Sequence, residues 1–84
     1  MNPAVELILT FRNIHEVMDA EKALLAADIP VRVMPLPDQL GTDCGMCLRL
    51  DPGDYGQARR VLRIPVSGVY TRQGAGKVYA PWQP

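Results

Sequence analysis

Residues 5–16, VELILTFRNIHE, decide the fold, because the hydrophobic periodicity changes within them. From residue 5 to residue 11 every odd-numbered position is a large apolar residue, which is typical of a strand with one buried face. Asn13 and Glu16 then have the spacing of a capping box, so a helix is predicted to begin near Ile14. The chain therefore starts with a strand that leads almost directly into a helix.

The two periodicities continue to alternate along the chain. The first helix is predicted to stop near Ala27-Asp28, because Pro30 disfavours a helical Ile29. Strands are predicted over residues 31–34, 46–50 and 66–71. Asp51-Pro52 marks the start of a second helix, with an N-cap acid and proline at the first helical position. The first helix is predicted to bury one stripe, made of Ile14, Val17, Met18, Ala20, Leu24 and Leu25, and the second to carry Arg59, Arg60 and Arg63 in its last turns.

The order strand, helix, strand, strand, helix, strand indicates the α+β class and the ferredoxin-like βαββαβ pattern. We expect a four-stranded antiparallel sheet with both helices on one face, formed by a single domain over residues 1–71. Residues 72–84 are expected to form a C-terminal tail, either loose or docking on a partner subunit. The sheet face away from the helices is expected to be mixed, and either open or paired in a dimer, with the residues Ile8, Thr10, Arg32, Met34, Cys47 and Arg49.

Charge and cysteine content exclude several classes of protein. The 84 residues contain nine basic and nine acidic side chains, so the formal net charge is zero. That balance argues against a surface for nucleic acid or anionic membrane. The chain has no signal-peptide pattern and no apolar run long enough for a membrane helix. Its two cysteines lie three positions apart, which is no disulfide framework, so we expect a cytoplasmic protein with reduced thiols.

Cys44 is the candidate reactive residue. In the expected topology the third strand runs antiparallel beside the first, so Cys44 should lie near the start of the first helix, close to Arg12 and His15. Free backbone N–H groups and nearby cations lower a thiol pKa and favour a nucleophilic thiolate. Gly45 lets the backbone bend beside the sulfur. The alternative is that Cys44 is inert and packs as a small hydrophobic residue on the core side with Met46.

Cys47 is interpreted as structural, and as an accessory at most. In an extended segment, residues i and i+3 point to opposite faces and lie about 10 Å apart, whereas a disulfide needs Cα atoms within about 7 Å.

The residues alone leave two other functions of the protein open. One is binding of a soft metal such as Cu(I) by Cys44 and Cys47, with His15 or Met46 as a further ligand. The other is a regulatory or dimerisation module that uses the open sheet face.

Residues 9–52, LTFRNIHEVMDAEKALLAADIPVRVMPLPDQLGTDCGMCLRLDP, resemble a family of small bacterial and archaeal selenium or sulfur carrier-like proteins. The resemblance extends over about residues 5–71 and rests on an ordered set of short matches: Thr10-Phe11, His15, Ala20-Glu21-Lys22, Ile29-Pro30, Pro35, Pro37, Cys44-Gly45 and Leu48-Arg49. The chain departs from the family pattern at four places. Asp28 replaces the family's glycine before Ile-Pro, Asp38 stands where the family often has an arginine, Thr42-Asp43 replaces small serines, and Cys47 is an extra thiol.

The resemblance implies that Cys44 carries sulfur or selenium as a persulfide or selenosulfide, supported by Gly45, Arg12 and His15. It implies a carrier rather than an enzyme, with no catalytic residue, no metal ligand and no cofactor. The implied partner is a sulfur or selenium donor protein such as a cysteine desulfurase, with no nucleic acid and no membrane. A homodimer is left open.

Overall fold

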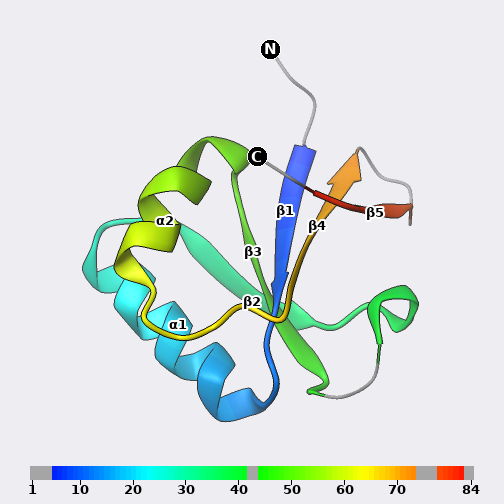
Figure 1. Cartoon of the computed structure of the whole chain (residues 1–84), viewed down its shortest axis with the longest axis horizontal. Coiled ribbons are helices and arrows are strands. Elements are labelled where there is room, and N and C mark those ends of the chain that lie inside the picture. Colours follow the sequence, from blue (N-terminus) through cyan, green and yellow to red (C-terminus); the bar gives the residue numbers. More distant parts are fainter. Residues whose placement is uncertain (1–4, 42–43, 74–77, 83–84) are drawn as a thin grey trace.

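The computed structural model describes residues 5–41, 44–73 and 78–82 and has an α+β fold with two α-helices. Its strands join into one antiparallel sheet in the order β2-β3-β1-β4-β5 (Figure 1). The elements are β1 (Val5–Thr10), α1 (Ile14–Ala26), β2 (Val31–Pro35), the 3-10 helix η1 (Asp38–Leu40), β3 (Met46–Leu50), the 3-10 helix η2 (Pro52–Asp54), α2 (Tyr55–Val61), β4 (Gly68–Gln73) and β5 (Tyr79–Pro81).

The sheet has five strands, so the expectation of four was wrong. The fifth strand comes from residues 72–84, which we expected to form a tail. Thr71 of β4 pairs with Ala80 of β5. The ladder continues where the Trp82 N–H donates to the Val69 carbonyl oxygen at 2.9 Å. The Trp82 ring meets the Tyr55 ring of α2 edge-to-face, with centroids 4.8 Å apart. The described part of this segment thus packs on its own chain; residues 74–77 and 83–84 lie outside the described residues.

One face of the sheet forms the hydrophobic core. Leu9 of β1 lies opposite Leu48 of β3, and Leu7 lies opposite Leu50, so four leucines share this face. Both helices lie on the same side of the strands in Figure 1 and add their buried residues to the same cluster. Leu7 and Leu9 of β1 therefore face the core, as the period of two predicted. The residues that the helices contribute are Val17, Ala20 and Leu24 of α1 and Ala58 of α2.

The opposite face of the sheet is also covered at its centre. Ile8 and Cys47 are 0% exposed and Thr10 is 8% exposed, although none of them belongs to the core cluster on the helix side. The loop that carries η1 lies on this side of the strands in Figure 1, and its Leu36 and Leu40 are half-buried. The expectation that this face is open was therefore wrong at its centre, because the single chain already removes Ile8 and Cys47 from water.

The buried stripe of α1 is narrower than its sequence predicted. Ile14, Met18 and Leu25 are 38%, 57% and 49% exposed, whereas Val17, Ala20 and Leu24 are fully buried. A single helix resting on a sheet touches it along one line, so the apolar residues flanking that line stay in solvent.

In α2 the prediction that Arg63 lies in the last turns of the helix was wrong, because the helix ends at Val61. No helix among the described residues combines the length and the apolar character needed to cross a bilayer.

The start of α1 confirms the predicted N-terminal signal with one change. The Asn13 side-chain oxygen accepts a hydrogen bond from the Glu16 N–H at 2.9 Å, which is the expected cap. The Glu16 carboxylate, however, accepts from the Arg12 N–H at 3.0 Å rather than from the N–H of Asn13. The reciprocal bond of the capping box thus reaches one residue further back.

The end of α1 places Asp28 in a conformation that favours glycine. The Ile29 N–H donates to the Leu24 carbonyl oxygen at 2.9 Å, and the Asp28 N–H donates to the Leu25 carbonyl oxygen at 3.0 Å. This pair of bonds is a Schellman motif, which requires a left-handed residue after the C-cap. Asp28 supplies it with φ of +59°. The Cβ of Asp28 therefore strains the backbone, and its carboxylate lies at the negative end of the helix dipole.

Replacing Asp28 with glycine is expected to stabilise the fold. Asp28→Gly relieves the left-handed strain but adds freedom to the unfolded chain, so the net gain should be about 0.5–1 kcal/mol in urea unfolding. Asp28→Ala is the matched control, because it removes the same charge but keeps the Cβ. An equal gain in Asp28→Ala would contradict this explanation and assign the effect to the charge.

The backbone conformation at residue 45 favours glycine, although the surroundings have room for a side chain. Its φ is +81°, yet nothing lies within 4 Å of the position that a Cβ would occupy. The Gly45 carbonyl oxygen accepts a hydrogen bond from the Leu36 N–H at 3.0 Å, which holds this bend against the end of β2. Gly56, in α2, has equally open space around its Cβ position and no left-handed φ.

The two glycines should respond in opposite directions to the same change. Gly45→Ala is expected to lower the free energy of unfolding by about 1–2 kcal/mol, because alanine is strained at positive φ. Gly56→Ala should raise it by about 0.5–1 kcal/mol, because alanine loses less entropy in a helix. Both values can be read from urea unfolding curves. A neutral Gly45→Ala would show that the bend is not needed.

Candidate functional site

Cys44 lies at the entrance to β3, at the end of the sheet where α1 begins. Because Leu9 pairs with Leu48 in antiparallel strands, the start of β3 lies beside the end of β1, from which the chain enters α1. Cys44 is half-buried and packs against the core cluster that contains Phe11. The topology predicted this end of the sheet for the thiol. Cys44 is thus a partly exposed residue that packs on the edge of the core.

Cys47 is buried on the other face of the sheet. Its Sγ lies 3.6 Å from the Met34 carbonyl oxygen and 3.7 Å from that of Pro35, which accept from the thiol. Burial, and secondarily the charge of a Cys44 thiolate, raises the pKa of the Cys47 thiol to about 11. At neutral pH Cys47 is therefore a protonated and weakly nucleophilic thiol. This agrees with its interpretation as a structural residue.

The two thiols are free and lie on different sides of the sheet. Cys44 packs on the helix side with Met46, while the 0% exposed Cys47 lies outside that cluster. In an extended strand such positions point in opposite directions. Among the described residues there is no group of three or more His, Cys, Asp or Glu side chains that could hold a metal ion. The arrangement of the two sulfurs gives no support to a two-thiol metal site.

The structure pairs Arg12 with Glu16 and leaves His15 on the surface. The Arg12 Nη2 lies 2.7 Å from the Glu16 Oε2, and the Arg12 side chain is 72% exposed. The side-chain hydrogen bond to Glu16, and after it the charge attraction, raises the pKa of Arg12. The same side-chain hydrogen bond, and after it the hydrogen bond from the Arg12 backbone N–H, lowers the pKa of Glu16. Within the described residues, neither Arg12 nor His15 makes a hydrogen bond or ion pair with Cys44.

A second charged cluster was missed by sequence reasoning. On the sheet face away from the helices, the Glu6 Oε2 lies 3.2 Å from the Arg49 Nε and 3.9 Å from the Arg72 Nη1. This oxygen is buried and has no hydrogen bond of good geometry, so its contacts with the two arginines are ion pairs. The alternation of side chains along the predicted strands places Glu6 and Arg49 on the sheet face away from the helices, and this was the signal in the sequence. That the two side chains meet depends on β1 and β3 being neighbours in the sheet, which no local sequence pattern shows.

Comparison with known proteins identifies the family. Residues 6–71 match the family described as "Putative Se/S carrier protein-like". The match spans most of the chain and includes α1, Cys44-Gly45 and both ends of β3. The comparisons with curated proteins and with solved structures found no match. The chain belongs to the Se/S carrier protein-like family.

Proposed function

We propose that this protein carries sulfur or selenium on Cys44, as a persulfide or a selenosulfide. One observation carries the proposal within the family: of the two thiols, Cys44 alone has access to solvent, whereas Cys47 is fully buried. A carrier thiol has to meet a thiol of another protein, which a buried sulfur cannot do. The raised pKa of Cys47 removes it further from nucleophilic chemistry at neutral pH.

The proposed loading step is a thiol exchange without net oxidation. The Cys44 thiolate attacks the outer sulfur of a donor persulfide, such as that of a cysteine desulfurase. A sulfur–sulfur bond forms on Cys44 while the donor's sulfur–sulfur bond breaks, and the donor cysteine leaves as a thiolate that takes up the proton. Selenium transfer from a donor selenosulfide follows the same balance. The protein is a carrier in this proposal, not an enzyme, and needs no cofactor.

Gly45, Arg12 and His15 support Cys44 in this proposal. The left-handed bend at Gly45 turns the chain directly after the sulfur, and no side chain at residue 45 covers it. The first turn of α1 has free backbone N–H groups at the same end of the sheet, and such groups stabilise an anion. The ion pair with Glu16 offsets much of the positive charge of Arg12, so the backbone N–H groups contribute most of the favourable potential.

The strand order also supports the ferredoxin-like pattern as a proposal. Strands β2-β3-β1-β4 are antiparallel neighbours and, with α1 and α2, repeat the expected succession of elements over residues 1–71. In this interpretation β5 is an added edge strand that pairs with β4.

We also propose that the protein works in the reducing environment of the cytoplasm, because both of its cysteines are free thiols.

Mass spectrometry of the folded protein after incubation with a cysteine desulfurase and cysteine tests the function. We expect the wild-type protein to gain the mass of one sulfur atom, located on Cys44 by fragmentation. Cys44→Ser should abolish the gain, and a reductant should reverse it in the wild type. Selenium loading can be followed in the same way with a selenium donor.

Cys47→Ala is the matched control, because it removes the other thiol from a site that takes no part in the transfer. It should load sulfur as the wild type does, whatever its stability. Absence of added sulfur on wild-type Cys44, or equal loading after Cys44→Ser, would overturn the proposed function.

A further inference from the structure

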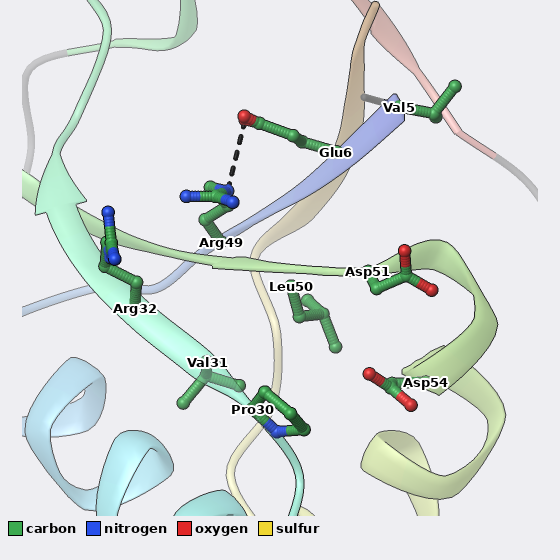
Figure 2. A pocket seen from close by; sticks show the side chains of 9 residues that line it. All are labelled: Val5, Glu6, Pro30, Val31, Arg32, Arg49, Leu50, Asp51 and Asp54. Carbon is green, nitrogen blue, oxygen red and sulfur yellow. Dashed lines mark ion pairs between the residues drawn. The ribbon is translucent and has the colours of Figure 1, made fainter. Parts of the chain in front are cut away.

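A pocket of about 360 Å³ lies at the end of β3 that is opposite to Cys44. It opens where β2 and β1 begin and where β3 leads into η2 (Figure 2). A volume of this size suits a small molecule. Nothing in the proposed chemistry of Cys44 uses it, because the whole length of β3 separates the two places.

Two arginines form one side of this pocket. Arg32 of β2 lies directly opposite Arg49 of β3, and like charges in directly opposed cross-strand positions are unfavourable. The Arg49 guanidinium pairs with the Glu6 carboxylate, with its Nε at 3.2 Å, and no other described residue forms an ion pair or side-chain hydrogen bond with it. Arg32 is exposed and, within the described residues, has no ion pair or hydrogen bond of its side chain. This side of the pocket therefore offers N–H groups that fit a carboxylate.

Two aspartates form the other side, as Figure 2 shows. Asp51 uses its Oδ2 to accept the Gly53 N–H at 2.8 Å, and Asp54, at the start of α2, makes no side-chain cap. Neither carboxylate takes part in an ion pair with any described residue. Asp54 is half-buried, so its charge is partly shielded from water without a compensating cation.

The charges of the pocket select the kind of ligand. With Glu6 paired to Arg49, the charged side chains of the pocket that have no ion pair among the described residues are Arg32 on one side and two aspartates on the other. A simple anion would satisfy Arg32 but be repelled by the aspartates, and a simple cation would leave Arg32 unpaired. The accessible apolar residues between them are Pro30 and Val31, whereas Leu50, which also lines the pocket, is 3% exposed and belongs to the core. A molecule with a carboxylate, an ammonium group and an apolar portion satisfies all three surfaces.

We propose that this pocket binds a zwitterion of the amino-acid type, either a free α-amino acid or a short peptide. The carboxylate of the ligand pairs with Arg32 and Arg49, and its ammonium group pairs with Asp51 and Asp54. The apolar portion lies on Pro30 and Val31. This inference does not depend on sulfur or selenium transfer by Cys44.

Titration of the ¹⁵N-labelled full chain, followed by NMR, tests the proposal with four probes: L-leucine, glycyl-L-leucine, acetate and methylammonium. We expect L-leucine or glycyl-L-leucine to shift the amide signals at the start of β2 and from Arg49 to Asp54, and whichever binds more tightly identifies the source of the zwitterion. Acetate and methylammonium carry one charge each and should bind at least about tenfold more weakly.

Variants of the two unpartnered side chains provide the second arm. Arg32→Gln and Asp54→Asn should each weaken the zwitterion by about tenfold, as expected for loss of one charge-assisted contact, while the fold is kept. Asp19→Asn and Arg60→Gln, on exposed helix faces, are the matched controls and should bind as the wild type does. Absence of binding by both zwitterions, equal binding of acetate, or shifts located elsewhere would each overturn the proposal.

Discussion

The register between β1 and β3 is the constraint on which the rest of the structure depends. Leu9 faces Leu48, and this pairing turns Leu7, Leu9, Leu48 and Leu50 towards the helices. Because side chains alternate along a strand, a shift of one residue in β3 would put Cys47 and Arg49 into the core and expel two leucines. The same alternation assigns Cys44 and Cys47 to different environments. Core packing and the chemistry of the two thiols are thus fixed by a single choice of register.

Much of the fold could be predicted from the sequence, because it is encoded by local patterns. The apolar alternation in residues 5–11, the Asn13 cap and the Asp51-Pro52 signal all mark elements that the structure contains. The fifth strand was missed because β5 has three residues, one of them Pro81, and becomes a strand only by pairing with β4. The exposure of Met18 and Leu25 was missed because periodicity identifies an apolar face but not how much of it a partner covers.

In the candidate site, too, some features could be predicted from local sequence patterns and others could not. Strand parity was sufficient to predict that the two cysteines lie on different faces of the sheet. The engagement of Arg12 by Glu16 was not predicted, because the choice between a nearby carboxylate and a more distant thiol depends on rotamers and distances. The charged pocket was also missed. Its residues come from β1, β2, β3 and η2, and none of them is unusual within its own segment.

β3 connects the two places where chemistry is proposed, with the Cys44-Gly45 bend at its start and the pocket at its end. The folded chain leaves Cys44 partly exposed and buries Cys47. Alkylation of the folded wild-type protein with iodoacetamide near neutral pH, resolved by fragmentation of the peptide that contains both residues, tests this most directly. We expect modification of Cys44 alone, with Cys47 reacting only on unfolding or as the pH approaches its pKa of about 11. Equal rates for Cys44 and Cys47 in the folded protein would contradict it.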